Sequence, residues 1–252
     1  MKQYGIIGYP LSHSFSPAYF NDKFAAEKID AEYLSLPVKI VTQFAGLQER
    51  YPDLMGLNVT IPHKTTIIPY LDFISTAARE INAVNCIKIT DGKLHGFNTD
   101  YFGFGESLKS LLNNTLPKAL VLGTGGSSKA ICYALSQMGI EYKLVSATDK
   151  GDYAYAELNE KTVQENLLII NTTPLGMFPN IDACPDIPYQ FLTENHLLYD
   201  LIYNPEETLF LQKGKAQHAT IKSGYEMLLL QAEKSWQIWN DPNTIGEIII
   251  PK

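Results

Sequence analysis

The sequence contains little cysteine and no recognisable set of metal ligands. Its three cysteines, Cys86, Cys132 and Cys184, are widely separated and odd in number, which fits neither a disulfide framework nor a zinc site. We therefore interpret them as small core residues. The five histidines show no ligand spacing such as HExxH, so we expect no metal.

Positive charge is also scarce. The chain has 20 basic and 27 acidic residues, a net charge of -7 and no long run of Lys or Arg. Such a balance argues against a nucleic-acid or anionic-membrane partner and favours a small-molecule ligand. An anionic ligand would need local donors such as hydroxyls, a helix N-terminus or single lysines, because the overall charge repels it.

Long hydrophobic runs are absent as well. Pro10 and Ser12 interrupt the start of the chain, which lacks the apolar centre of a signal peptide, and no later segment approaches the ~18 apolar residues of a membrane span. We expect a cytoplasmic protein, either monomeric or homodimeric. With 252 residues, 45% of them hydrophobic, the chain can bury one large core or two smaller ones.

Short β-type runs alternate with helical patterns in the first hundred residues, which predicts an α/β sheet with parallel strands. Asp91-Gly92, between the β-type runs 83–90 and 93–98, predicts a hairpin. The alternation restarts after Pro117, so we place a domain boundary near residue 101. The last helical pattern, 224–239, is too apolar to stand alone.

Three glycines, Gly123, Gly125 and Gly126, lie between a β-type run (119–123) and a helical pattern (127–139). Glycines at this place let the chain turn tightly and let backbone N–H groups approach a pyrophosphate at the positive end of a helix. A GxGG pattern alone is weak evidence. The preceding strand and Ala130 on the helix favour a nucleotide site over an ordinary turn.

The tip of the next predicted strand indicates which nucleotide binds. An acidic side chain there would bind a free ribose 2′-OH, and a basic one would accept a 2′-phosphate. Residues 146–148 contain no carboxylate, while the hydroxyls of Ser146 and Thr148 and the charge of Lys150 favour NADP. Asp149 argues in the other direction if it faces the phosphate.

A second set of polar residues lies beside apolar strands, where unpaired polar groups are costly to bury. Each member has a purely structural alternative: Asp100 could cap a helix, Asn58 and Asn85 could close turns, and Lys64 could be a solvated cation. Ser16, followed by Pro17, is expected to cap a helix. Ser14 is expected on the same side of an extended segment, so that both hydroxyls could bind a carboxylate.

Together these motifs resemble shikimate dehydrogenase, in the family's order and over nearly the whole chain. The matching segments are SHSFSP (12–17), NVTIPHK (58–64), AVN (83–85), NTD (98–100), GTGGSSKA (123–130), NTTPLGM (171–177), DLIYNPEET (200–208) and GYEMLLLQ (224–231).

The resemblance implies a reversible, NADP-dependent reduction of 3-dehydroshikimate to shikimate in aromatic amino acid biosynthesis. It also implies two α/β domains with a cleft between them. A substrate domain would comprise residues 1–100 and the C-terminal helix 224–252, and a Rossmann-like NADP domain residues 101–223.

The same resemblance implies the roles of individual residues. Lys64 and Asp100 would be the catalytic pair. The substrate would be held by Ser14, Ser16, Thr60, Asn85, Tyr203 and Gln231. The cofactor would be held by Gly123, Thr124, Gly125, Gly126, Ser127, Ser146, Thr148, Lys150, Thr172 and Gly224.

One departure from the family concerns Ala147, which stands where NADP-dependent members usually carry an arginine. An arginine there would pair with the 2′-phosphate more strongly than a generic cation. A quinate/shikimate dehydrogenase that uses NAD or both cofactors is therefore an alternative. A non-catalytic nucleotide-sensing module is a third interpretation, against which the presence of both Lys64 and Asp100 argues.

Overall fold

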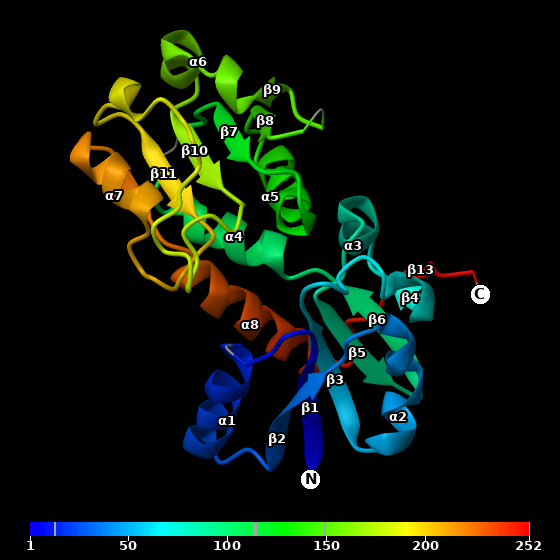
Figure 1. The fold of residues 1–252 in the computed structure, drawn as a ribbon. Helices are drawn as coiled ribbons and strands as arrows, with labels where there is room; N and C mark the ends of the chain where they lie inside the picture. The colour runs from blue at the N-terminus through cyan, green and yellow to red at the C-terminus, as the bar shows by residue number, and fades with distance from the viewer. Residues whose placement is uncertain (13, 113–114, 149, 252) are drawn as a thin grey trace. The chain divides into compact units, whose positions relative to one another are not determined.

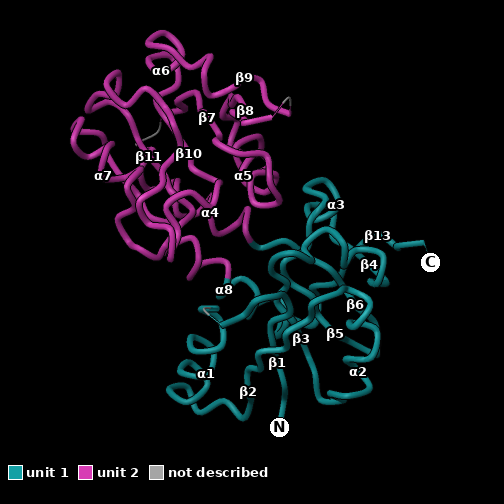
Figure 2. Tube along the Cα trace, viewed as in Figure 1, with its two compact units in different colours: residues 1–99, 232–252 teal, residues 100–231 magenta. Residues whose placement is uncertain are grey.

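The computed structural model describes residues 1–12, 14–112, 115–148 and 150–251, which fold into two compact units. Figure 1 shows their helices and strands, and Figure 2 colours the units separately. Unit 1 contains residues 1–99 and 232–252, and unit 2 contains residues 100–231. Each unit is built around its own β-sheet.

The sheet of unit 1 has the strand order β13-β4-β6-β5-β3-β1-β2. Its strands are β1 (Lys2–Gly8), β2 (Ala31–Pro37), β3 (Leu54–Val59), β4 (Phe73–Ile74), β5 (Cys86–Thr90), β6 (Lys93–Phe97) and β13 (Ile248–Ile249). Its helices are α1 (Ser16–Glu27), α2 (Leu47–Arg50) and α3 (Thr76–Ile81), with 3₁₀ turns η1 (Val41–Gly46) and η2 (Ile68–Tyr70).

This first sheet is mixed. Strand β1 is parallel to β2 and β3, as the alternating pattern predicts, but β5 runs antiparallel to both β3 and β6. The predicted hairpin is confirmed: Thr90 pairs with Lys93, and Asp91 and Gly92 have φ values of 50° and 71°. Positive φ at both central residues matches the twist of paired antiparallel strands.

Unit 2 has a parallel sheet in the order β12-β11-β10-β7-β8-β9. Its strands are β7 (Ala119–Leu122), β8 (Tyr142–Ser146), β9 (Tyr153–Ala154), β10 (Leu168–Asn171), β11 (Leu197–Asp200) and β12 (Thr220–Lys222). Its helices are α4 (Asp100–Lys109), α5 (Gly126–Gln137), α6 (Glu160–Glu165) and α7 (Leu209–Ala216), with 3₁₀ turns η3 (Tyr155–Glu157) and η4 (Tyr189–Phe191). This is the predicted Rossmann-like arrangement.

The last helix, α8 (Tyr225–Asn240), contributes to both cores. Met227, near its start, packs in the core of unit 2 with Phe104 and Tyr199. Trp239, near its end, packs in unit 1, where its ring stacks on Tyr4 with centroids 5.0 Å apart. Its apolar character therefore reflects burial on both stretches. The unit boundary falls between Gln231 and Ala232, inside the helix.

Burial also accounts for two of the cysteines. Cys86 and Cys132 lie in the cores, and burial raises the pKa of their thiols to about 12 and about 11. Their burial confirms the interpretation of these two as core residues, and both thiols stay protonated as a consequence; Cys184 is half-buried. In the described part of the chain, no helix has the length and apolar character needed to cross a membrane.

Candidate active site

Lys64 lies in a short segment after β3 that backbone hydrogen bonds hold at both ends. The N–H of Thr60 donates to the carbonyl of Ile7 in β1 at 2.9 Å. The carbonyl of Lys64 accepts from the N–H of Val84, just before β5, at 2.7 Å. Thr60 and Lys64 are half-buried. The segment is therefore fixed to two neighbouring strands while both side chains stay accessible.

His63 gives this segment a further anchor. Its side chain is buried, and its Nε2 atom lies 2.7 Å from the carbonyl oxygen of Val38, just after β2. The residue next to Lys64 is thus tied to another part of unit 1. His63 is a positioning residue that the sequence did not predict, and its place beside Lys64 in the chain is the one signal that could have indicated it.

Asn85 joins the end of β3 to the segment that precedes Asp100. Its carbonyl accepts from the N–H of Val59 at 2.8 Å. Its side-chain Oδ1 accepts from the N–H of Thr99 at 2.6 Å, and its Nδ2 donates to the Thr99 hydroxyl at 2.9 Å. Asp100 follows directly as the buried first residue of α4 and of unit 2.

A buried polar network lies behind these residues in unit 1. The Tyr33 hydroxyl donates to Asn58 Oδ1 at 2.6 Å, and Asn58 Nδ2 donates to Ser235 Oγ at 3.0 Å. Ser235 Oγ is 3.2 Å from Thr99 Oγ1. Burial raises the pKa of Tyr33 well above its ordinary value, so the hydroxyl stays protonated and can donate. Asn58 itself lies in strand β3, paired with Cys86, so it does not close a turn.

Sequence reasoning missed Tyr33 and Ser235 as members of this network. Both lie in segments whose patterns predict ordinary core packing, β2 and α8. A buried hydroxyl requires a partner, but the partners come from segments far apart in the chain. Pairings of this kind become visible only in the folded protein.

The serine pair differs from its expected geometry. Ser16 is the first residue of α1, and the preceding Phe15 already has helical angles (φ -67°, ψ -41°), so the prediction of Ser16 as N-cap is wrong. Proline near the start of the helix is compatible with this, because first-turn N–H groups need no intrahelical partner. Ser16 itself is buried in unit 1.

The segment before α1 also turns. The N–H of Ser14 donates to the carbonyl of Leu11 at 3.1 Å, so Ser14 and Ser16 do not share the extended segment that we expected. His13, between Leu11 and Ser14, lies outside the described residues. The two serines remain neighbours at the N-terminus of a helix, which is where backbone N–H groups favour an anion.

The remaining residues predicted to contact substrate belong to unit 2. Tyr203 follows β11 and is half-buried, and burial raises the pKa of its hydroxyl, which therefore stays protonated. Gln231 lies in α8, and its Nε2 donates to the carbonyl of Leu228 at 2.9 Å. The predicted set is thus divided: Ser14, Ser16, Thr60, Lys64 and Asn85 lie in unit 1, and Asp100, Tyr203 and Gln231 in unit 2.

The glycine loop of unit 2 joins β7 to α5, as predicted. Gly123 has φ 104°, a region that favours glycine, and a Cβ there would lie 2.9 Å from Thr172 Oγ1. The Thr172 hydroxyl donates to the carbonyl of Leu122 at 2.6 Å. The end of β7 and the loop after β10 are therefore in close contact, and glycine at position 123 permits it.

The N-terminus of α5 is open. Gly125 is the N-cap and supplies no side-chain cap, and a Cβ added at Gly125 or Gly126 would meet nothing within 4 Å. Thr124 and Ser127 flank these glycines. Uncapped N–H groups at the positive end of a helix, with open space before them, suit a pyrophosphate.

The tip of β8 carries the predicted hydroxyls. Ser146 Oγ lies 3.1 Å from Thr148 Oγ1 and accepts from the N–H of Thr148 at 3.1 Å. Asp152, further along, accepts from the N–H of Leu144 at 2.8 Å, so its carboxylate is engaged on β8 itself. Lys150 is exposed. Asp149 lies outside the described residues.

Comparison with known proteins identifies the family. Residues 6–87 match the model of the shikimate dehydrogenase substrate binding domain. A protein of Clostridium beijerinckii named shikimate dehydrogenase (NADP(+)) is 40% identical over 259 residues, covering 96% of this chain and 93% of that protein. The chain belongs to the shikimate dehydrogenase family.

Solved shikimate dehydrogenases share the whole fold. The crystal structure from Aquifex aeolicus is 34% identical, with a TM-score of 0.85, and the match covers 95% of this chain and 92% of that one. The Thermus thermophilus shikimate dehydrogenase, solved with NADP(H) and shikimate, is 30% identical, with a TM-score of 0.85 and coverage of 98% and 95%. These matches confirm the predicted two-domain α/β fold class.

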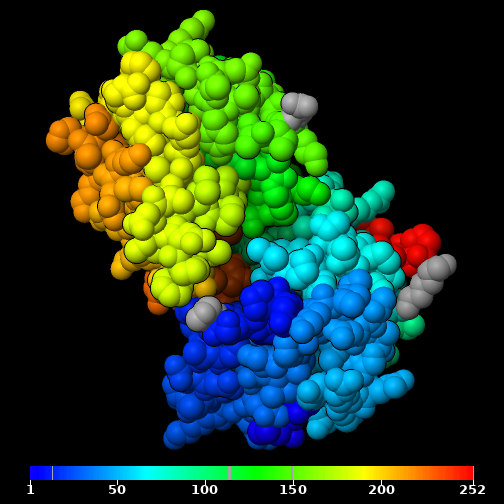
Figure 3. Space-filling view, in the orientation of Figure 1, coloured from blue at the N-terminus to red at the C-terminus, as the bar shows by residue number. Residues whose placement is uncertain are grey.

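The space-filling view in Figure 3 shows that the loop after β10, coloured yellow-green, forms part of the surface of unit 2. The segment NTTPLGM (171–177) covers the end of β10 and the first part of this loop. Leu175, Met177 and Phe178 are 39%, 47% and 53% exposed. The hydroxyl of Thr172, at the start of the loop, is hydrogen-bonded to the carbonyl of Leu122, whereas these three later residues present apolar surface.

Proposed function

We propose that this chain is a shikimate dehydrogenase that catalyses the reversible reduction of 3-dehydroshikimate to shikimate with NADPH, in the biosynthesis of aromatic amino acids. The single observation that carries the proposal is the identity of 40% over 96% of the chain to a shikimate dehydrogenase (NADP(+)). The geometry of both units is consistent with this activity.

The residues of unit 2 fit a dinucleotide. The uncapped N-terminus of α5 offers N–H groups to the pyrophosphate, and the missing side chains of Gly125 and Gly126 leave room for it. The hydroxyls of Ser146 and Thr148, together with exposed Lys150, would bind the 2′-phosphate. Thr172 and Gly224 complete the proposed cofactor site. NADPH held by these residues would supply the hydride that reduces the ketone of the substrate.

Hydride delivery leaves negative charge on the ketone oxygen, so the site needs a positioned proton donor. We assign this role to the Lys64 ammonium, which donates a proton to that oxygen as the alcohol forms. In the reverse direction the neutral amine accepts the proton. The hydrogen bond from the Val84 N–H to the Lys64 carbonyl fixes the backbone from which this side chain extends, which limits the reorganisation needed in the transition state.

Asp100 is assigned to orientation and proton exchange. Thr99, immediately before it, is held by both side-chain groups of Asn85, so the backbone leading to Asp100 is fixed in unit 1. Ser14, Ser16, Thr60, Asn85, Tyr203 and Gln231 would bind the carboxylate and hydroxyls of the substrate. Their hydroxyl and amide groups can hydrogen-bond to such groups locally. The negative net charge of the chain cannot attract the carboxylate.

Domain roles, location and assembly are part of the same proposal. The substrate domain would comprise residues 1–100 with the C-terminal helix 224–252, and the NADP domain residues 101–223. We propose a cytoplasmic enzyme, monomeric or homodimeric, without a nucleic-acid partner. The acidic net charge of -7 supports the last point.

Ala147 supports a second candidate, a quinate/shikimate dehydrogenase that uses NAD or both cofactors. The decisive experiment measures oxidation of shikimate and of quinate by the purified chain, each with NADP+ and with NAD+. The proposal expects the highest kcat/KM with shikimate and NADP+. A higher value with quinate or with NAD+ would favour the second candidate, and no reduction of either cofactor would contradict both.

A further inference from the structure

Asp200 is a buried carboxylate in unit 2 to which the proposed mechanism gives no role. It is the last residue of β11 and is 0% exposed. None of the ion pairs found among the described residues includes it. Burying a carboxylate without a cation is costly, so hydrogen bonds must offset its desolvation.

Three donors reach this carboxylate from three segments. Asn171 Nδ2, at the end of β10, donates to Asp200 Oδ1 at 3.1 Å. The N–H of Ile202, just after β11, donates to the same oxygen at 3.0 Å. The Thr208 hydroxyl, at the N-cap of α7, donates to Oδ2 at 2.6 Å. One side chain therefore links two strand ends and a helix start.

The link to Asn171 determines the conformation of the loop after β10. An ionised carboxylate can only accept, so it requires the NH₂ side of the Asn171 amide and turns the carbonyl side the other way. Asn171 Oδ1 then accepts from the N–H and the hydroxyl of Thr173, at 3.0 and 2.7 Å. Thr172 lies between these two residues and contacts the glycine loop.

The link to Ile202 determines the loop after β11. While the N–H of Ile202 is held by Asp200, its carbonyl accepts from the N–H of Gly224 at 3.1 Å. A Cβ at Gly224 would lie 2.1 Å from the carbonyl oxygen of Leu201, so only glycine permits this approach. Tyr203 follows Ile202 directly, so the bonds that hold Ile202 also determine where the Tyr203 backbone lies.

We propose that Asp200 is a positioning residue: as an acceptor-only group it orients Asn171 and Ile202, and through them it sets the loops that present Thr172 and Tyr203. This inference rests on the proposed function, which assigns Thr172 to the cofactor and Tyr203 to the substrate. In this scheme Asp200 itself contacts neither the substrate nor the cofactor.

Asp200→Asn tests the inference with almost no change of size. The amide retains one acceptor oxygen and loses the negative charge. If its NH₂ group faces Thr208, whose hydroxyl can also accept, the oxygen keeps Asn171 and Ile202 but binds both more weakly; if it faces either of these two, that bond breaks. We expect the Kd of NADP+, measured by calorimetry, and the KM of shikimate each to rise about tenfold, with a smaller change in kcat. The free energy of unfolding at neutral pH should not fall, because a buried charge is removed.

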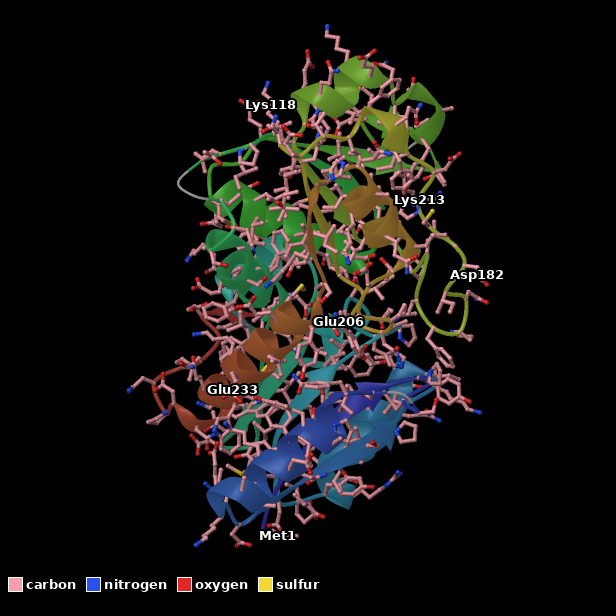
Figure 4. All side chains as sticks on the ribbon, turned by 90° about the vertical axis from the view of Figure 1, so that its left-hand side faces the viewer. Met1, Lys118, Asp182, Glu206, Lys213 and Glu233 are labelled. Atoms are coloured by element: carbon pink, nitrogen blue, oxygen red, sulfur yellow. The ribbon has the colours of Figure 1, made fainter. Side chains whose placement is uncertain are left out.

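Two further variants sharpen the test. Glu206→Gln makes the same charge change at an exposed residue of the loop between β11 and α7, labelled in Figure 4, and should leave all constants unchanged. Asn171→Ala removes the amide that joins Asp200 to the loop after β10, with its bonds to Thr173 and Leu175, and leaves the bonds from Ile202 and Thr208 to Asp200 in place. It should raise the Kd of NADP+ about as much as Asp200→Asn does, and change the KM of shikimate by less than about threefold.

The outcomes separate the inference from the proposed function. If the unmodified chain neither binds NADP+ nor oxidises shikimate, the proposed function fails. If it does both and Asp200→Asn behaves like Glu206→Gln, the positioning role of Asp200 is overturned. A loss of binding that is matched by a fall in the free energy of unfolding would assign Asp200 to stability alone and would also overturn it.

Discussion

Asn85 binds Thr99 twice: its Oδ1 accepts from the Thr99 N–H at 2.6 Å, and its Nδ2 donates to the Thr99 hydroxyl at 2.9 Å. The Asn85 carbonyl meanwhile pairs with Val59 at the end of β3. A single buried amide thus connects the strand that leads to Lys64 with the residue that precedes Asp100. Asn85 therefore helps to position the backbone on the approach to both members of the proposed catalytic pair.

Lys64→Ala should abolish most turnover. Without the ammonium group, no positioned donor stabilises charge on the substrate oxygen, and we expect kcat to fall about 10²- to 10⁴-fold. Direct binding of shikimate should change much less. The matched control is Lys109→Ala, which removes a solvent-exposed lysine paired with Glu106. Turnover of Lys64→Ala close to that of the control would disprove the assignment.

Ser14→Ala should affect affinity more than chemistry. The side chain is half-buried and caps no helix N–H, so its removal deletes the proposed substrate contact with little structural cost. We expect the KM of shikimate to rise about tenfold while kcat changes little. Steady-state kinetics with saturating NADP+ provides the measurement. A large fall in kcat with unchanged KM would place Ser14 in the chemical step instead.

Ala147→Arg should strengthen the preference for NADP+. An arginine at the tip of β8 can pair bidentately with a 2′-phosphate, and we expect the ratio of kcat/KM for NADP+ to that for NAD+ to rise about tenfold. Lys150→Ala should lower the same ratio. Lys143→Ala is the matched control, because Lys143 is an exposed lysine of β8 whose charge is already paired with Asp152. If Lys150→Ala leaves the ratio unchanged, Lys150 does not contact the 2′-phosphate.

Asp200 should make stability depend on pH. Burial raises the pKa of its carboxyl to about 6 from 3.8, because hydrogen bonds from Thr208, Ile202 and Asn171 only partly offset the desolvation. The folded protein therefore binds this proton more tightly than the unfolded chain. The contribution of Asp200 to the free energy of unfolding should fall by about 3 kcal/mol as pH rises from about 4 to about 6.

Asp200→Asn should remove this dependence. Other groups titrate in both proteins, so the difference between their unfolding curves across this range isolates Asp200. Tyr189 is one titratable group influenced by the Asp200 charge: burial raises its pKa most, followed by Cys184 and then Asp200, so Tyr189 stays neutral throughout this range. Denaturant unfolding at several pH values measures the effect. Parallel curves for the two proteins would show that burial does not perturb Asp200.

Local sequence signals predicted much of the fold. The Asp91-Gly92 hairpin, the glycine loop before α5 and the parallel strands of unit 2 each depend on a few neighbouring residues. Backbone preferences and hydrophobic periodicity act over such short distances, so they can be interpreted without the fold. The two-residue strands β4, β9 and β13 are too short to carry a pattern, and they were not predicted.

The sequence by itself determined that this chain is a two-domain α/β protein of the shikimate dehydrogenase family, because its motifs keep their residue types and order along the chain. Only the tertiary structure decided that Ser16 lies inside its helix, and that the buried Asp200 carboxylate accepts a hydrogen bond from Asn171. Buried polar groups must find partners, and the folded chain supplies those partners from segments distant in sequence.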